Sequence, residues 1–260
     1  MLRNKTALVT GSTSGIGLGI ARALAAQGAN IVLNGFGNPH DIEDLRATMA
    51  AEFGVEVLYS DADMAVPQKI RALVEMAVAR TGRLDILVNN AGIQHTSPVE
   101  QFPDDKWDAV VAINLSANFH AIKAALPHMR AQGRGRIVNI ASVHGLVAST
   151  NKCAYVAAKH GVIGLSKAVA LETAGAGITC NAVCPGWVLT PLVQKQIDDL
   201  AAREAIAPEQ AQQQLLAQKQ PSGAFATPAQ LGALVVFLCS DAAEQISGAS
   251  MTVDGGWTAQ

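Results

Sequence analysis

The chain repeats one pattern almost from end to end: a short apolar run rich in β-branched residues is followed by a longer stretch with helical periodicity. Several of the short runs are apolar nearly throughout instead of alternating, which is typical of strands covered on both faces. Strands are predicted at residues 7–10, 30–34, 55–60, 86–89, 135–141, 178–184 and 250–253. Helices are predicted at residues 16–27, 41–53, 67–81, 104–132, 154–174 and 228–238. With right-handed crossovers, this alternation predicts an α/β fold with a doubly wound parallel sheet.

The length and composition fit one large core. The chain has 260 residues, of which 50% are hydrophobic and 15% charged, and it has no recognisable linker. We therefore expect a single domain over residues 1–260. Residues 191–228 interrupt the alternation with a Gln- and Ala-rich segment that predicts one or two inserted helices. This insertion is either a surface feature or a lid over a site at the carboxyl edge of the sheet.

Charge and cysteine content narrow the possible partners. The formal net charge is −2 and there is no polybasic region, so neither nucleic acid nor an anionic membrane surface is an expected partner. No apolar stretch is long and unbroken enough to predict a membrane span, and the N-terminus lacks a signal pattern. The four cysteines form no C-x-x-C pair, and buried, reduced thiols in the cytoplasm are expected. The histidines lack ligand-like spacing, so no catalytic metal is predicted, and a structural cation at subunit interfaces stays an open alternative.

A glycine-rich turn follows the first predicted strand and precedes a helix. Gly11, Gly15 and Gly17 have the spacing G-x-x-x-G-x-G. Glycines allow a tight turn and a close approach to a pyrophosphate, while the helix N-terminus offers free N–H groups. Glycine-rich turns are common, but this position between a strand and a helix favours dinucleotide binding.

Other residues are predicted at the same edge of the sheet. Asp63, after the third strand, is either a contact for the adenine amino group or a helix cap. Residues 89–92, Asn-Asn-Ala-Gly, follow the fourth strand and leave room for a ribose. Phe36 stands where an acidic residue is common in NAD users, yet no Lys or Arg occurs there or at Ser14 to bind a 2′-phosphate. NAD is therefore favoured over NADP.

Tyr155 and Lys159 are the main candidates for chemistry. They are four residues apart in a predicted helix and so share one face. The ammonium and the positive nicotinamide ring would stabilise a tyrosinate, so that Tyr155 could take the proton of an alcohol while hydride leaves for the cofactor. Ser142, at the carboxyl end of a strand, would hold the substrate oxygen. Asn114, in the long predicted helix, would hold a water beside Lys159. Each residue has an ordinary structural explanation, but their joint occurrence favours an active site.

Together, the motifs resemble those of the short-chain dehydrogenase/reductase family. The matching pieces are residues 10–17, 89–92, 114, 142, 155–159 and 185–190, in the family order. The resemblance implies a Rossmann-type fold with about seven strands, an Asn114–Ser142–Tyr155–Lys159 tetrad and a homotetramer. The cofactor-binding residues are then expected to be Gly11, Ser14, Gly15, Ile16, Gly17, Phe36, Asp63, Asn90, Gly92, Tyr155, Lys159, Pro185, Gly186, Val188 and Thr190.

Six short stretches carry a closer resemblance: residues 92–95, 142–145, 151–155, 184–187, 194–196 and 255–258. They resemble bacterial family members that interconvert (R)-3-hydroxybutyrate and acetoacetate with NAD. This resemblance implies that Gln94, His144, Lys152 and Gln196 hold the carboxylate of a small hydroxy or keto acid. Trp187 and Trp257 would add apolar walls beside Ser142 and Tyr155, completing the expected substrate-binding set. Taken singly, each polar residue is more simply a solvated surface residue. The alternatives are another short-chain reductase, such as a 3-oxoacyl-thioester reductase with NADPH, or a non-catalytic NAD-binding regulator.

Overall fold

The computed structural model describes residues 1–217 and 219–259, and it confirms the predicted parallel sheet. Its seven strands follow the order β3-β2-β1-β4-β5-β6-β7, and every pairing is parallel. The strands are β1 (Thr6–Val9), β2 (Asn30–Asn34), β3 (Val57–Ser60), β4 (Ile86–Asn89), β5 (Gly135–Ile140), β6 (Ile178–Pro185) and β7 (Ser250–Val253). Their bounds lie within about two residues of the predicted ones, the usual uncertainty of an element end.

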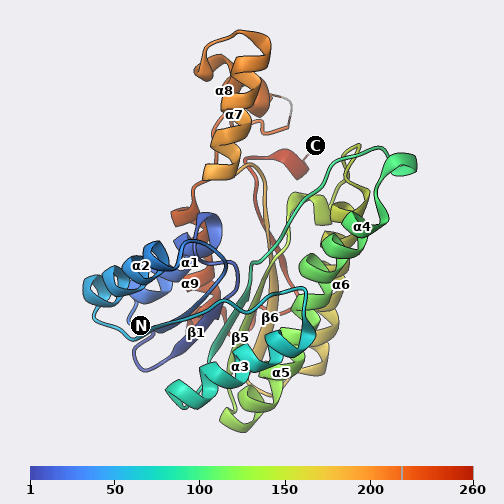
Figure 1. The fold of residues 1–260 in the computed structure, drawn as a ribbon. Coiled ribbons are helices and arrows are strands. Elements are labelled where there is room, and N and C mark those ends of the chain that lie inside the picture. Colours follow the sequence, from blue (N-terminus) through green and yellow to red (C-terminus); the bar gives the residue numbers. More distant parts are fainter. Residues whose placement is uncertain (218, 260) are drawn as a thin grey trace.

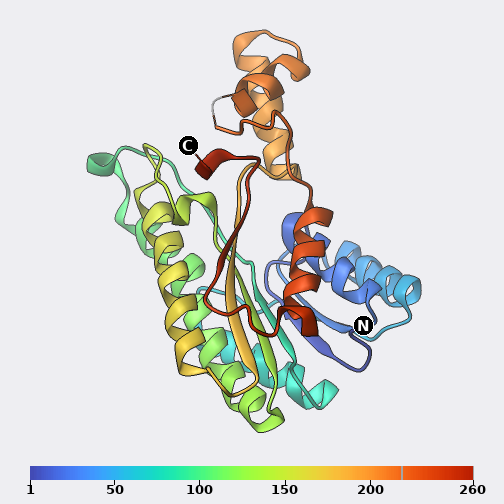
Figure 2. The ribbon, with the colours of Figure 1, turned by 180° about the vertical axis from the view of Figure 1, so that it is seen from behind.

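Helices cover both faces of this sheet, as Figures 1 and 2 show. One layer contains α1 (Gly15–Ala26), α2 (Pro39–Phe53) and α9 (Pro228–Cys239). The other contains α3 (Pro67–Thr81), α4 (Asp104–Val111), α5 (Ala117–Gln132) and α6 (Cys153–Glu172). Helix α2 begins at Pro39, two residues before its predicted start, because the Asn38 side chain accepts a hydrogen bond from His40 N and caps the helix.

The two layers explain why the strands are apolar on both sides. In β1, Ala7 and Val9 belong to the core beneath α1 and α9, where they lie with Ile20 and Leu24. Leu8, between them, belongs to the opposite core beneath α3 and α5. Successive side chains of a strand point to opposite faces. A strand covered on both faces therefore buries every side chain, and all four residues of β1 are buried.

The long helix predicted at 104–132 is continuous in direction but not regular. A π-helical segment, Ala112–Ser116, separates α4 from α5. The extra residue of a π-turn gives no periodicity signal in sequence, and such turns are frequent at functional sites. The prediction of an uninterrupted α-helix was therefore wrong at this point.

By length and composition alone, the stretch Asp104–Gln132 could cross a membrane. The location of this stretch in the fold explains its apolar composition without a membrane. Ala121, Ala125 and Met129 of α5 are buried in the same core as Leu87 of β4 and Ile137 of β5. The apolar face of α5 is thus already used against the sheet, as in a core helix of an α/β fold.

The segment between β6 and α9 forms the predicted helical insertion. It contains α7 (Pro191–Glu204) and α8 (Pro208–Ala217), which pack together through Val193, Ile197, Ala201 and Ala211. Figure 1 shows this pair above the carboxyl edge of the sheet, beside the C-terminus. The pair therefore stands over the edge where open α/β sheets bind their ligands.

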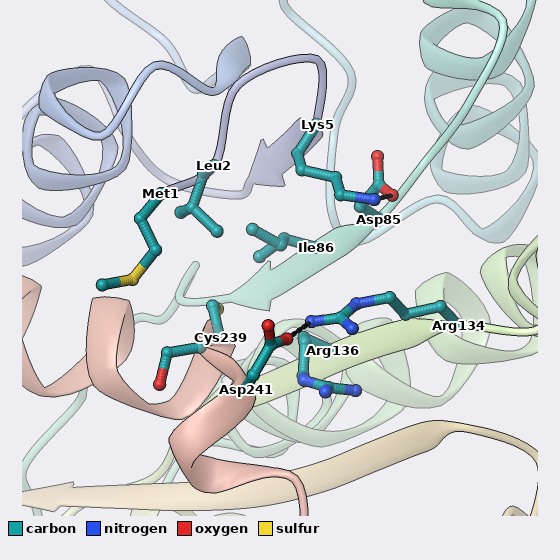
Figure 3. A pocket seen from close by; sticks show the side chains of 10 residues that line it. Met1, Leu2, Lys5, Asp85, Ile86, Arg134, Arg136, Cys239 and Asp241 are labelled. Carbon is teal, nitrogen blue, oxygen red and sulfur yellow. Dashed lines mark hydrogen bonds and ion pairs between the residues drawn. The ribbon is translucent and has the colours of Figure 1, made fainter.

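A charged cluster holds the opposite, amino edge of the sheet. Asp85 is 4% exposed, and its carboxylate accepts hydrogen bonds from Arg83 and from Thr6 N while Lys5 lies 3.2 Å away. Figure 3 shows the small cavity there, with the Lys5–Asp85 and Arg134–Asp241 ion pairs across it. Burial by itself would raise the pKa of Asp85, but these donors and cations together hold it below its ordinary value.

We expect Asp85→Asn to lower the free energy of unfolding by about 3 kcal/mol at pH 7, because it leaves buried donors and cations without their carboxylate. A carboxyl with a depressed pKa stabilises the fold above its unfolded pKa of about 4 and loses that effect as the pH falls through its folded pKa. The difference in unfolding free energy between wild type and variant, measured by urea unfolding, should therefore become smaller below about pH 4. Asp241→Asn, at the exposed pair, is the control and should change unfolding little. Equal effects of both variants would contradict this interpretation.

Candidate active site

The loop after β1 is shaped by close contacts that only glycine permits. A Cβ on Gly17 would lie 2.3 Å from Gly11 O and 2.4 Å from the Asn90 side-chain nitrogen. Gly11 and Gly15 have φ of +60° and +57°, in the left-handed region. The turn can therefore press against the loop after β4 without a side chain between them.

Asn90 and Thr10 join these two loops. Asn90 Nδ2 donates to Thr10 O at 2.9 Å and to Gly11 O at 2.8 Å. In return, Thr10 Oγ1 accepts from the backbone N–H groups of Asn90 and Ala91. The strand order reverses between β1 and β4, so these bonds fix the crevice at the switch point of the sheet.

The N-terminus of α1 is open to a ligand in this crevice. The Ser14 side chain makes no capping hydrogen bond, and the first turn of α1 contains no acidic residue. Its free N–H groups and positive dipole end suit a pyrophosphate. A cavity of about 420 Å³ lies in front of it. The lining residues are Gly11, Thr13, Ser14, Gly15, Ile16, Asn34, Gly35, Phe36, Ala62, Asp63, Met64, Asn90, Ala91, Gly92, Ile93, Ile113, Thr190 and Pro191.

Most of the predicted cofactor residues line this cavity, but some lie elsewhere. Gly17 lies behind the glycine turn, and Pro185 is buried at the end of β6. Gly186, Val188 and Tyr155 line a neighbouring cavity, while Lys159 lies beneath it. Asp63 lines the cavity, and its Oδ1 accepts a hydrogen bond from Ala65 N at 2.8 Å. That bond closes a turn before α3 and does not cap the helix, whose N-cap is Val66.

The neighbouring cavity, of about 180 Å³, brings together all eight residues predicted to bind substrate. It also shares Ile16 and Thr190 with the larger cavity, so the two adjoin. Its lining residues are Ile16, Gln94, Ser142, Val143, His144, Lys152, Tyr155, Gly186, Trp187, Val188, Thr190, Val193, Gln196 and Trp257. They come from the start of α1, from the ends of β4, β5 and β6, from α6 and α7, and from the C-terminal turn. No acidic residue is among them.

Tyr155 and Lys159 stand on one face of α6, as their spacing predicts. The Lys159 ammonium lies 5.6 Å from the centre of the Tyr155 ring and donates to Ile140 O at 2.7 Å. Lys159 is 4% exposed, and burial lowers its pKa to about 8. A proton on this group is therefore only loosely held near neutral pH.

The Tyr155 phenol is not yet activated in the protein alone. Burial raises its pKa above the ordinary value, and a hydrogen bond with Ser142 opposes that rise. Lys159 by itself therefore does not lower the pKa of Tyr155 below its ordinary value, and the prediction also relied on the positive nicotinamide ring. A further positive charge in the adjoining cavity would be needed to lower the pKa of Tyr155.

Asn114 lies buried in the long helical stretch, as predicted, but within its π-helical segment. It is fully buried in the π-helical segment, where Oδ1 accepts from Ile93 N and Nδ2 donates to Ile93 O, each at 2.8 Å. These two bonds hold the loop that leads to Gln94. The side-chain amide thus makes one accepted and one donated hydrogen bond to the backbone of Ile93, and the role of Asn114 in holding a water beside Lys159 stays a prediction.

His144 is a neutral polar group in the small cavity. Burial, followed by the charge of Lys152, lowers its pKa to about 4. Its Nε2 lies 2.9 Å from Ser149 Oγ, and its backbone N donates to Ser142 Oγ. The ring therefore serves as a hydrogen-bonding group, not as a cation, at neutral pH.

Lys152 supplies positive charge to the same cavity. It is the N-cap residue of α6, so it precedes the helix instead of lying on its face. Its ammonium lies 6.0 Å from the Trp187 ring centre, and burial lowers its pKa, with a smaller contribution from Lys219. Within the described ranges, no carboxylate lies at ion-pair distance from it.

The sequence reasoning missed some residues of this region. Val143 and Val193 line the small cavity, and Ser149 contacts His144. The two valines are adjacent to predicted residues or on the predicted lid, which is the one signal that could have found them. Cys153 is half-buried where a buried thiol was expected, while the other three cysteines are buried and all four are free.

Comparison with known proteins agrees with this architecture. Residues 5–201 match the family model described as short chain dehydrogenase. D-beta-hydroxybutyrate dehydrogenases of Cupriavidus necator and Rhizobium meliloti are 58% and 52% identical to the chain. These alignments cover 100% of the chain and 100% of the first relative, and 98% and 99% for the second. A solved variant of actinorhodin polyketide ketoreductase with NADPH superposes with a TM-score of 0.91 at 36% identity, covering 99% of both chains.

The chain therefore belongs to the short-chain dehydrogenase family. It is an oxidoreductase, and members of this family use a nicotinamide cofactor. The glycine turn and the uncapped N-terminus of α1 fit that group.

Proposed function

We propose that the enzyme interconverts (R)-3-hydroxybutyrate and acetoacetate with NAD. The observation that carries this proposal is the acid-free cavity of about 180 Å³ that joins Tyr155 and Ser142 to Lys152 and His144. It is small compared with the roughly 300–1,000 Å³ of sites for drug-sized ligands. An unpaired ammonium, a neutral imidazole and two glutamine amides suit a single carboxylate. The names of the close relatives agree with this assignment.

Each residue of this cavity has a role in the proposed reaction. Lys152, His144, Gln94 and Gln196 bind the carboxylate, and Trp187 and Trp257 limit the size of the other end. A bound nicotinamide cofactor supplies the hydride acceptor. Ser142 holds the hydroxyl oxygen of the substrate, and Tyr155 takes its proton, because both side chains line the same cavity and Ser142 lowers the pKa of Tyr155. Lys159 stabilises the phenolate that results.

We also propose that the enzyme works as a homotetramer in the cytoplasm. Support comes from apolar side chains that remain exposed on the outer layer, including Phe119 and Leu171 beside a groove along α5 and α6. The four free cysteines agree with a reducing compartment. Sedimentation of the purified chain as a monomer would exclude the tetramer.

Tyr155→Phe should lower kcat by about 10²–10⁴-fold, because the ring is retained but the proton acceptor is lost. Binding of NADH, measured by fluorescence titration, should remain within a few-fold of wild type since the phenylalanine ring fills the same space. A variant with wild-type turnover would show that Tyr155 is not the acid–base group.

Lys152→Ala should raise KM for (R)-3-hydroxybutyrate by about 10–100-fold, since a hydrogen bond to a charged group is lost. NAD reduction is measured with both enantiomers of 3-hydroxybutyrate, with lactate and with uncharged 2-butanol. Only the charged substrates should respond to the substitution. Lys167→Ala, at an exposed position of the same helix, is the matched control. Equal losses with 2-butanol would remove the carboxylate role, and absence of wild-type activity on (R)-3-hydroxybutyrate would refute the function.

The preference for NAD is supported by the charge of the larger cavity. None of its described lining residues is Lys, Arg or His, and its one charged residue is Asp63. A 2′-phosphate would thus find no cation there. Phe36, 67% exposed at the cavity rim, stands at the position that commonly decides the choice.

Phe36→Arg should shift the ratio of kcat/KM for NAD over NADP toward NADP by about tenfold or more, because a guanidinium can bind the phosphate. Phe36→Asp is the opposite-charge control and should not improve NADP use. Both ratios are measured with the same substrate. If both variants moved the ratio equally in one direction, the charge argument for NAD would fail.

A further inference from the structure

Gln220 is a buried amide in a segment that is otherwise largely exposed. It follows α8 and is 2% exposed, while Lys219 before it and Pro221 after it are exposed. Its backbone continues the turn of α8, because Gln220 N donates to Leu216 O at 2.8 Å. This bond ties Gln220 to the end of α8.

Both ends of its side-chain amide are engaged. Oε1 accepts a hydrogen bond from Trp187 N at 2.8 Å, and Nε2 donates to Ala224 O. On its other side, the Trp187 peptide is held by Ala226, whose N–H donates to Trp187 O at 3.0 Å. The segment that follows α8 thus hydrogen-bonds to the backbone of Trp187 at two points, the Trp187 N–H and the Trp187 carbonyl.

Two glycines make room for this side chain. A Cβ on Gly186 would lie 2.7 Å from Gln220 Oε1, and a Cβ on Gly255 would lie 2.7 Å from Gln220 Cγ. Ser222 N donates to Gly255 O at 2.9 Å. The amide is therefore packed between the chain leaving β6 and the turn after β7.

Those two chain segments carry the aromatic walls of the substrate cavity. Trp187 directly follows Gly186, and Trp257 follows Gly255 by two residues. The ring centres are 6.2 Å apart, and both rings line the cavity. Trp187 also packs on the small core of α7 and α8, and Val193 and Gln196 of α7 complete the lining.

We infer that Gln220 is a positioning residue that locks the α7–α8 pair to the Trp187–Trp257 wall, and so sets substrate affinity and the size limit of the cavity. Gln220 does not line the cavity and acts through the two backbones that it joins. The inference rests on the proposed function, since it concerns the same substrate site.

The first test is Gln220→Met, which keeps the length of the side chain but cannot hydrogen-bond. KM for (R)-3-hydroxybutyrate should rise about tenfold, because two buried hydrogen bonds are lost and the Trp187 backbone is released. Activity on the longer 3-hydroxyvalerate should fall less, since the wall is looser. NADH affinity should change less than KM, since Gln220 lines neither cavity and its hydrogen bonds hold the Trp187 side of the substrate cavity. Gln213→Met, at an exposed position of α8, is the matched control.

The second test uses Gln220→Glu, whose carboxyl titrates. When protonated, it can accept from Trp187 N and donate to Ala224 O, as the amide does; when ionised, it loses the donor. Burial raises the pKa of such a carboxyl. The ratio of its kcat/KM to that of wild type should therefore fall as the pH rises, whereas the ratio for Gln220→Met should be flat. A general structural defect would give no such pH-dependent rescue.

A fluorescence measurement separates this inference from the proposed function. Tryptophan emission should change in Gln220→Met because the surroundings of Trp187 and Trp257 change. The variant Trp187→Phe separates the emission of this pair from that of the exposed Trp107. If wild type fails to oxidise (R)-3-hydroxybutyrate but the emission of Gln220→Met still changes, the proposed function is refuted. The structural coupling of Gln220 to Trp187 and Trp257 is then still supported. The coupling is overturned if Gln220→Met matches wild type in emission, KM and size preference, or if the Gln220→Glu ratio is independent of pH. Should Gln220→Met not fold, Gln220→Glu at low pH still decides.

Discussion

The contact between the first and fourth strand exits is the constraint on which the rest of this structure depends. Asn90 and Thr10 exchange hydrogen bonds where the strand order reverses, and Gly17 packs against both Gly11 and Asn90. This contact fixes the start of α1, and with it the cradle for a pyrophosphate. The small cavity adjoins that cradle through Ile16 and Thr190, so its position follows from the same contact.

Electrostatics then distinguishes the two cavities. The larger one has no described cation in its lining, which favours a dinucleotide without a 2′-phosphate. The smaller one contains Lys152, which has no acidic partner among the described residues, and His144, whose pKa is lowered to about 4. Burying an unpaired ammonium is costly unless a ligand neutralises it. Partial burial lowers the pKa of Lys152, and a bound carboxylate would favour its charged form.

The chemical centre shows why a cofactor and a protein site must act together. Burial raises the pKa of Tyr155 and lowers that of Lys159 to about 8, so both groups disfavour their charged forms. The hydrogen bond from Lys159 to Ile140 O holds the ammonium in place, while Ser142 opposes part of the rise in the pKa of Tyr155. In the proposed mechanism, the positive charge of an oxidised nicotinamide in the adjoining cavity would lower the pKa of Tyr155 and so favour deprotonation of the substrate.

Local spacing in the sequence determined the elements and the chemical pairs. Uniformly apolar runs predicted the strands of a doubly wound sheet, and the i, i+4 spacing put Tyr155 and Lys159 on one helix face. Family motifs pointed to the other residues of the small cavity. Only the tertiary structure decided that Asn114 lies in a π-helical turn bound to Ile93, and that Gln220 joins the segments before Trp187 and Trp257. Such contacts link elements distant in the chain, and their geometry is set by packing across the sheet, which no local periodicity encodes.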